Sequence, residues 1–296
     1  MGTLQAFDLH IHSNNSDGAD SWQTILQRAE EANLECISIT DHDNCEVYLQ
    51  IKDSEKYFSG KIITGIEMQA YFKGLSIEIL GYGFDIVKMQ QYLQGLYLPF
   101  PKVNLIELER LHAKCIAQGM TFALNIIENY NSKTHYYATD YLHEEMRKFS
   151  HNKNLIPDAE SWARENIFFK RHTSNPNSSF YVDESDIVPA ADKVIELIRK
   201  AGGKVVLPHV YQYEENTDLV LNGLVESMDG IECFYPSFTD DQTKHLLNLC
   251  KKRNLLITGG SDYHGGKRPG KIGEIGNSAL CRTNINDILK LQGTIL

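Results

Sequence analysis

Residues 186–207, DIVPAADKVIELIRKAGGKVVL, join a helical pattern to a strand pattern with only two residues between them. Apolar positions recur at helical spacing over residues 186–201, and Gly202 and Gly203 follow where a helix commonly ends. The short apolar run at residues 204–207 has the length of a strand. This stretch therefore predicts a helix over residues 186–201 that leads directly into a strand.

The same alternation continues on both sides of this segment. Residues 22–33 have the pattern of an amphipathic helix, for which Ser21 is a suitable N-terminal cap. We expect further helices from about Asn44 and over residues 240–253. Strand patterns occupy residues 6–10, 36–40, 62–66, 77–82, 230–234 and 255–258. Together they predict an α/β fold in which helices cover a mainly parallel sheet.

The middle of the chain has a different character. Between about Pro99 and Tyr181 we find helical patterns, at residues 105–118 and 136–149, separated by breaks rich in Asn and Ser. The partly basic stretch at residues 168–179 reads as an exposed loop. The simplest interpretation is a helical insertion, residues 99–181, within a discontinuous α/β domain formed by residues 1–98 and 182–296.

Composition and charge limit the class of protein. A chain of 296 residues, 42% of them hydrophobic, can bury a substantial core. Its net charge of −10 disfavours duplex nucleic acid as a partner, because such binding needs clustered Lys and Arg. The six cysteines are widely spaced, as in reduced cytosolic proteins. Since no signal-peptide or membrane-spanning pattern is visible, we expect a cytoplasmic protein without a membrane partner. The oligomeric state stays open.

Potential metal ligands follow five of the predicted parallel strands. Because the carboxyl ends of parallel strands form one face of an α/β barrel, we expect these side chains to meet there. An isolated His-x-His pair is usually incidental, but five strand ends with suitable residues are hard to attribute to chance. The residues are His10, His12, Asp17, His42, Glu67, His209, Asp262 and His264.

The donor types indicate which ions would bind. Imidazole and carboxylate groups without thiolate suit Zn, Mn or Fe. The set is larger than one tetrahedral ion needs, so we expect two or three divalent ions. Clustered ions can produce hydroxide near neutral pH and neutralise a phosphoryl group.

Six motifs carry a closer resemblance. They are DLHIHS at 8–13, SDG at 16–18, ITDHD at 39–43, GIE at 65–67, ILGY at 79–82 and GSDYHG at 260–265. In this order they resemble the PHP (polymerase and histidinol phosphatase) family, in particular its stand-alone TrpH-like phosphoesterases, which also carry a helical insertion. The resemblance implies a distorted (β/α)7 barrel with a three-metal site on its C-terminal face.

The resemblance also implies a role for each residue. His10, His12, Glu67 and Asp262 would hold one ion, and Glu67 would bridge to a second ion shared with His209. Asp17, His42 and His264 would hold the third ion and form the catalytic group. Asp43 would orient its neighbour His42 rather than bind metal. A metal-bound hydroxide would then hydrolyse a small phosphoester.

One position departs from the family pattern. Three residues before Gly81, where the family usually has His, this chain has Glu78. We expect Glu78 to remain a ligand of the second ion, with the preference shifted toward Mn or Fe because carboxylate is a harder donor than imidazole. A partly filled or absent second ion is the competing interpretation.

Candidate phosphate contacts lie in two places. Related phosphoesterases often have an Arg-x-His pattern in the insertion, and Lys133-Thr134-His135 occupies a comparable position. Lys133 and His135 are therefore candidates, although a solvated helix start explains Lys133 equally well. Arg268 is a third candidate, and Arg171 with His172 could form part of a lid.

The leading functional hypothesis is hydrolysis of a small phosphorylated substrate. Nucleoside monophosphates and 3',5'-bisphosphates rank first. The alternatives are histidinol-phosphate hydrolysis, exonuclease action on short oligonucleotides, and a non-catalytic metal-binding PHP module.

Overall fold

The computed structural model describes residues 7–132, 134–135, 137–267 and 270–276. These residues form two compact units. The first, here called the sheet unit, comprises the described residues within 1–70, 78–94 and 191–296. The second, here called the helical unit, comprises those within 71–77 and 95–190. The predicted insertion, residues 99–181, lies inside the second unit.

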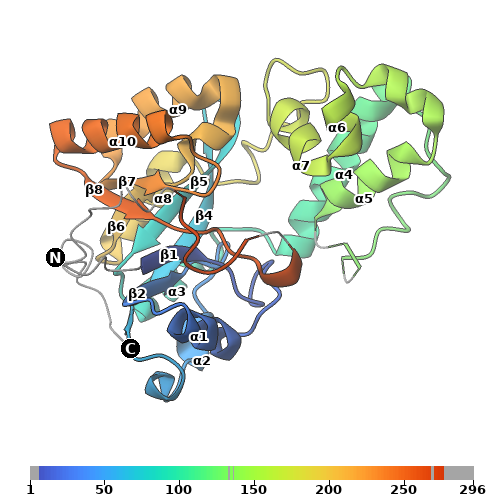
Figure 1. Ribbon diagram of the computed structural model, residues 1–296. Coiled ribbons are helices and arrows are strands. Elements are labelled where there is room, and N and C mark those ends of the chain that lie inside the picture. The colour runs from blue at the N-terminus through green and yellow to red at the C-terminus, as the bar shows by residue number, and fades with distance from the viewer. Residues whose placement is uncertain (1–6, 133, 136, 268–269, 277–296) are drawn as a thin grey trace. The chain divides into compact units, whose positions relative to one another are not determined.

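The sheet unit contains an α/β arrangement (Figure 1). The end of β4 and the start of β5, within Tyr71–Ile77, belong to the helical unit. The strands are β1 (Phe7–Ile11), β2 (Cys36–Ile39), β3 (Lys61–Ile62), β4 (Gly65–Phe72), β5 (Leu75–Tyr82), β6 (Lys204–Leu207), β7 (Gly230–Phe234) and β8 (Leu256–Gly259). The helices are α1 (Trp22–Glu31), α2 (Val47–Gln50), α3 (Ile86–Leu93), α8 (Ala191–Lys200), α9 (Thr217–Leu224) and α10 (Asp240–Arg253).

The strands form two sheets. One has the order β1-β2-β3 and is parallel. The other has the order β4-β5-β6-β7-β8, in which β6, β7 and β8 are parallel and β5 runs antiparallel to β6. The strand-helix alternation is confirmed. The strands β1, β2 and β7 are buried along their whole length, as expected for strands that are covered on both faces.

Two backbone bridges connect the sheets at the ends of their strands. Ile11 of β1 pairs with Tyr263, and the amide of His12 donates to the Tyr263 carbonyl at 2.8 Å. His42 pairs with Glu67 of β4, and the amide of Asp43 donates to the Glu67 carbonyl at 2.8 Å. The same segments carry predicted metal ligands, so the bridges fix these ligands relative to one another.

Local signals set several helix ends. The Ser21 side chain accepts a hydrogen bond from the Thr24 amide, which confirms the predicted cap of α1. After α8, Gly202 adopts a φ of +88°, and the Gly203 amide donates to the Ile198 carbonyl. α8 packs against β6, and α10 packs against β7 and β8 (Figure 1). No helix in the described ranges is long and apolar enough to cross a bilayer.

The predicted start of the helix over residues 186–201 is wrong. Helix α8 begins only at Ala191, after Pro189 and Ala190. Proline lacks an amide hydrogen and disfavours helical backbone in the residue before it. The Pro189 carbonyl accepts a hydrogen bond from the Tyr71 amide instead, and Ala190 forms a bridge to Tyr71.

The predicted strand over residues 62–66 is interrupted. It divides into β3 and β4, and the break is filled by the buried side chain of Tyr48. The Tyr48 hydroxyl lies 2.6 Å from the Ile39 carbonyl oxygen and accepts a hydrogen bond from the Gly65 amide at 2.8 Å. A side chain from the preceding helix thus replaces part of the sheet's hydrogen bonding.

The helical unit has its own hydrophobic core. Its helices are α4 (Phe100–Ala117), α5 (Ala138–Arg147), α6 (Ala159–Ala163) and α7 (Glu165–Phe168). The two predicted helices of the insertion are confirmed as α4 and α5. Leu108 and Leu111 of α4 pack in one buried cluster with Leu142 and Met146 of α5.

The exposed loop predicted over residues 168–179 is wrong in its first half. Phe168 is buried, and a π-helical turn follows at Phe169–Thr173. The buried His172 ring lies 3.2 Å from an Asp158 carboxylate oxygen and 3.1 Å from the Ser161 hydroxyl. These partners lie more than ten residues away, so the Asn- and Ser-rich composition of the stretch gave no sign of the packing.

We predict that Tyr48→Phe lowers the free energy of unfolding by about 1–3 kcal/mol, because the buried amides of Ile39 and Gly65 lose their acceptor. Urea denaturation measures the change. The control is Tyr57→Phe, since the Tyr57 ring packs edge-on against Trp22 and that contact does not need the hydroxyl. A Tyr48→Phe protein as stable as the control would contradict the role of this hydroxyl.

Candidate metal centre

All nine predicted metal ligands lie in the sheet unit, and the structure brings them together. They come from β1 and the loop after it, the loop after β2, strands β4 and β5, the loop after β6 and the loop after β8. The residues are His10, His12, Asp17, His42, Glu67, Glu78, His209, Asp262 and His264. Three overlapping groups within this set have ligand atoms no more than 4.8 Å apart and could each hold a metal ion.

The first group is deeply buried. It consists of His10, His12, Glu67 and Asp262. Oε2 of Glu67 lies 3.1 Å from Nε2 of His10 and 3.2 Å from Nε2 of His12. Oδ1 of Asp262 is 3.2 Å from the same His12 nitrogen. Three of the four side chains are at most 1% exposed, so this group has the least contact with solvent.

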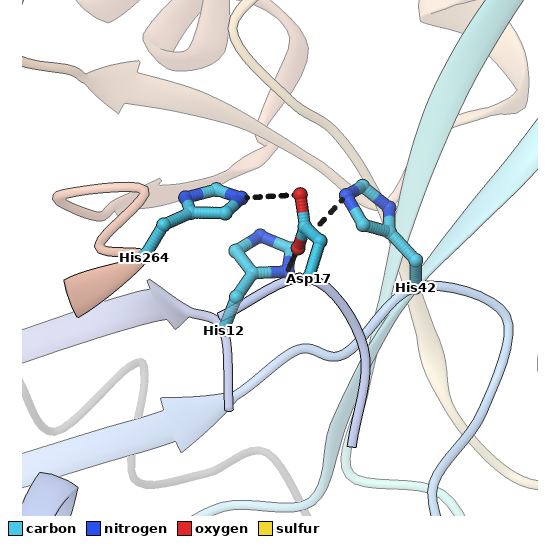
Figure 2. A group of neighbouring side chains, drawn as sticks. All are labelled: His12, Asp17, His42 and His264. Atoms are coloured by element: carbon cyan, nitrogen blue, oxygen red, sulfur yellow. Dashed lines mark ion pairs between the residues drawn. The ribbon is translucent and has the colours of Figure 1, made fainter. Parts of the chain in front are cut away.

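The second group surrounds the Asp17 carboxylate. Figure 2 shows the rings of His12, His42 and His264 arranged around it. His264 Nε2 is 3.1 Å from Asp17 Oδ2, whereas His42 Nε2 and His12 Nδ1 are each 3.7 Å from Asp17 Oδ1. A neutral imidazole has one nitrogen lone pair. Since Nε2 of His12 is closer to its carboxylates than Nδ1 is, the ring is better suited to the first group.

The third group is more open. It includes His42, Glu67 and Glu78. His209 is adjacent, with Nε2 3.0 Å from Oε1 of Glu67 and 3.2 Å from Oε2 of Glu78. The Glu78 side chain is 36% exposed. Glu67 thus directs one oxygen toward the first group and the other toward His209.

The direction of β5 explains why Glu78 reaches this group. Leu80 pairs with Val206 in the antiparallel ladder between β5 and β6. Glu78 lies two residues earlier on β5, so it is level with the end of β6, beside His209. Because β5 runs antiparallel to β6, its first half lies at the edge of the sheet where β6 ends.

The residues fit divalent transition metals. Nε2 of His10 and Nε2 of His12 are buried and make no hydrogen bond within the described part of the chain. Leaving such atoms unsatisfied costs about 1–3 kcal/mol each, and a coordinated cation would remove that cost. The nitrogen and oxygen donors, without thiolate, suit Zn, Mn or Fe.

Opposite charges stabilise the cluster. Burial opposes protonation of His12, but the adjacent carboxylates of Asp262 and Glu67 outweigh it and raise its pKa to about 10. Burial likewise opposes protonation of His209, yet Glu67 and Glu78 raise its pKa to about 10. Burial opposes ionisation of Glu67, but the charge on His10 holds the pKa of this carboxyl well below its ordinary value. Protons on the histidines therefore compete with metal.

Two buried carboxylates that the predictions did not assign connect the loops of the centre. Asp41 accepts hydrogen bonds from the Ser13 amide at 2.7 Å and the Ser16 hydroxyl at 2.6 Å. Asp8 accepts from the amides of Ser261 at 2.9 Å and Gly273 at 2.8 Å. Both aspartates belong to the sequence motifs that contain His10 and His42. Membership of these motifs is the sequence signal that could have identified them.

Two further residues at the centre had no sequence signal. The Tyr235 hydroxyl donates to Oδ2 of Asp262 at 2.8 Å. Glu232 of β7 is fully buried and contacts both His10 and His209. They lie outside every motif, and only the pairing of β7 with its neighbours brings them to the centre.

Asp43 secures the turn after His42. Its carboxylate accepts a hydrogen bond from the Gln69 amide at 2.8 Å, and its own amide donates to the Glu67 carbonyl. It adopts a φ of +52°, which Asp tolerates better than most residues do. These bonds attach the turn to β4; an orienting effect on the His42 ring stays a prediction.

The predicted phosphate contacts lie in the helical unit or outside the described residues. His135 lies in the helical unit, with Nε2 3.1 Å from Oε2 of Glu144. Arg171 forms ion pairs with Asp158 and Glu160 of the same unit, at 3.3 and 3.0 Å. Lys133 and Arg268 lie outside the described residues. Their contact with a phosphate stays a prediction.

A known protein family matches the first half of the chain. Residues 8–157, half of the chain, match the PHP domain. The chain belongs to the PHP domain family. Given this membership and the cluster of possible metal ligands, it is a hydrolytic phosphoesterase.

Curated relatives align with nearly the whole of this chain. A phosphoribosyl 1,2-cyclic phosphate 1,2-diphosphodiesterase from Eggerthella lenta is 28% identical over 91% of this chain and 97% of its own length. A 5'-3' exoribonuclease from Haemophilus influenzae is 27% identical over 87% and 89%. A 3',5'-nucleoside bisphosphate phosphatase from Chromobacterium violaceum is 23% identical over 93% of each chain.

A solved structure supports the fold. It is a protein from Bifidobacterium adolescentis assigned as a metal-dependent phosphoesterase. It superposes with a TM-score of 0.68 at 19% identity, covering 98% of this chain and 97% of its own. At this identity the likeness concerns the α/β fold alone.

We predict that the metal-free protein loses stability as the pH rises from 7 to 8.5. The folded-state pKa values of His12 and His209, about 10, exceed their ordinary value of 6.5. Their protonation therefore stabilises the folded state fully below pH 6.5, and this contribution is lost as the pH rises toward 10.

Denaturant midpoints of chelator-treated protein at the two pH values measure this effect. Protein saturated with Mn²⁺ is the control, because metal binding needs neutral histidines and becomes stronger with rising pH. If the denaturant midpoint of the metal-free protein stays constant or rises between pH 7 and 8.5, His12 and His209 are not protonated in the folded state as assigned.

Proposed function

We propose that this phosphoesterase hydrolyses small phosphorylated nucleotides, with nucleoside monophosphates and 3',5'-bisphosphates as the first candidates. The observation that carries the proposal is the convergence of nine His, Asp and Glu side chains at one edge of the sheet. Such a concentration of buried ligand atoms would be costly without bound cations.

We assign the ligands to three divalent ions of Mn, Fe or Zn. His10, His12, Glu67 and Asp262 would hold the first. Glu67, through its other oxygen, would share the second with His209 and Glu78. Asp17, His42 and His264 would hold the third. The separate contacts of the two Glu67 oxygens support the bridging role.

Bound divalent ions would neutralise a phosphoryl group and make a water molecule more acidic. The protein side chains would orient this chemistry. Burial opposes ionisation of Asp17, but His42 and a hydrogen bond from His264 hold its pKa well below the ordinary value, so it remains a carboxylate at neutral pH. The Tyr235 hydroxyl fixes the carboxylate of Asp262.

Exposure indicates the side on which substrate approaches. The His10 and His12 side chains are 0% exposed, whereas His42 is 18% and Glu78 is 36% exposed. A phosphate group would therefore enter beside His42 and Glu78, with the His10 and His12 ligands behind it.

We infer that the two sheets form one distorted seven-stranded barrel, with β3 and β4 as a single broken strand. The bridges Ile11–Tyr263 and His42–Glu67, which close the gaps between the sheets, support this inference. We also propose that residues 99–181, the helical insertion, supply substrate contacts, with Lys133 and His135 as candidates. Arg268, outside the insertion, is a further candidate for contact with a phosphate group.

The relatives also favour a second candidate, hydrolysis of short oligonucleotides, through the exoribonuclease from Haemophilus influenzae. The net charge of −10 opposes long polyanions but not short ones. Phosphate-release assays with Mn²⁺ separate the candidates. The panel is AMP, adenosine 3',5'-bisphosphate, histidinol phosphate and a 5'-phosphorylated RNA pentamer.

We expect release from a nucleotide. Faster cleavage of the RNA would establish the second candidate instead. Preference for histidinol phosphate would contradict both the nucleotide and the oligonucleotide hypotheses. Absence of release from every compound, in protein shown to contain metal, would indicate a non-catalytic metal-binding module.

We predict that His42→Ala and Asp262→Ala each lower kcat by at least about 100-fold, with little loss of secondary structure, because both lie in loops at strand ends. Steady-state kinetics and circular dichroism provide the measurements. His245→Ala, an exposed residue on α10, is the control. Retained turnover in either variant would contradict its assignment as a ligand.

We predict that Glu78→His raises affinity for Zn²⁺ relative to Mn²⁺, because imidazole is a softer donor than carboxylate. Competition of the two ions, read by elemental analysis after gel filtration, measures the ratio. Glu46→His, at an exposed position, is the matched control. An unchanged ratio would remove Glu78 from the proposed ligand set.

A further inference from the structure

Glu232 occupies a position that the proposed ligand set does not use. Within the five-stranded sheet, β7 is the strand that contributes no predicted ligand, and it lies between β6 and β8. The Glu232 side chain is 0% exposed. Among the described residues, Glu232 forms an ion pair with His10 and none with a Lys or Arg. A buried carboxylate without such a cation is costly, so stability alone does not explain it.

Each oxygen of Glu232 contacts a different part of the metal centre. Oε1 lies 3.1 Å from Nδ1 of His10 on β1. Oε2 accepts a hydrogen bond from the backbone amide of His209 at 2.8 Å, at the end of β6. One carboxylate therefore connects two ligands that are far apart in the sequence.

The contact with His10 selects the tautomer of its ring. A neutral imidazole carries its proton on one nitrogen and its lone pair on the other. If Nδ1–H donates to Glu232, the lone pair lies on Nε2. This atom faces Glu67 at 3.1 Å and Asp262 at 3.5 Å. The tautomer set by Glu232 is the one that can bind a cation at the first group.

The contact with His209 fixes an unfavourable backbone conformation. His209 has a φ of +22° and a ψ of +45°. Such conformations cost about 1–3 kcal/mol and persist when neighbouring groups hold them. The bond from its amide to Glu232 stabilises this turn, and the ring then reaches Glu67 at 3.0 Å and Glu78 at 3.2 Å.

We propose that Glu232 is a positioning residue that raises metal affinity at two places, by holding His10 in the Nε2-ligating tautomer and His209 in its strained turn. The inference rests on the proposed metal-dependent function. Removing a group that orients a ligand commonly lowers metal affinity by about 10–100-fold.

Glu232→Gln tests the proposal because it preserves shape. The amide oxygen can still accept from His209, but the amide nitrogen then donates toward His10 and favours a proton on Nε2. The matched control is Thr258→Val, at the position paired with Glu232 on β8. Thr258 is 1% exposed, and its hydroxyl makes no hydrogen bond in the described part of the chain.

Chelator competition with Zn²⁺ and Mn²⁺, in protein whose circular dichroism matches wild type, is the first measurement. We expect Glu232→Gln to weaken binding about 10–100-fold and Thr258→Val to leave it unchanged. Wild-type affinity in Glu232→Gln, or equal weakening in both variants, would overturn the proposal.

A second measurement does not depend on whether the variant folds. In ¹⁵N-histidine-labelled wild-type protein loaded with Zn²⁺, the His10 ring should show a protonated Nδ1 and a metal-bound Nε2. Metal-bound Nδ1 would overturn the inference. Phosphate release is assayed separately. Weaker metal binding by Glu232→Gln, with no hydrolysis by wild type, would refute the proposed function and leave the role of Glu232 intact.

Discussion

The electrostatic balance of a buried cluster constrains the rest of this structure. Four histidines and the carboxylates of Asp17, Glu67 and Asp262 lie at one edge of the sheet with little access to water. Neither sign of charge is stable there alone, so each group depends on its partners. The arrangement is well suited to exchange protons for divalent cations, and it accounts for the raised pKa values of His12 and His209.

Keeping such a cluster in register requires backbone support from several strands. The pairing of Ile11 with Tyr263 and of His42 with Glu67 joins the two sheets at the edge where the ligands lie. Buried carboxylates outside the ligand set then connect the loops, as Asp41 does with Ser13 and Ser16. The centre is therefore held by the bridges between the sheets together with these buried carboxylates, and not by any single loop.

Glu78 and Glu232 show how strand direction and strand order shape the chemistry. The antiparallel course of β5 places Glu78 level with the end of β6, on the more exposed side of the centre. Glu232 is fully buried and contacts His10 and His209. One carboxylate is partly exposed to solvent and the other is not, although both lie beside His209.

The sequence by itself determined the elements whose signals are local. Helical periodicity, the Ser21 cap and the glycines after α8 act over a few residues, and the ligand motifs stand at strand ends, so the α/β fold and the ligand candidates could be predicted. The late start of α8 has a local cause in Pro189, and the bond from the Tyr71 amide to the Pro189 carbonyl adds a tertiary one. The tertiary structure alone decided the break at Tyr48 and the packing of Phe168 and His172. It also decided the place of Glu232, because its contact with His10 joins residues 222 positions apart. Local patterns carry no record of which distant strands become neighbours, and that pairing requires the whole chain to fold.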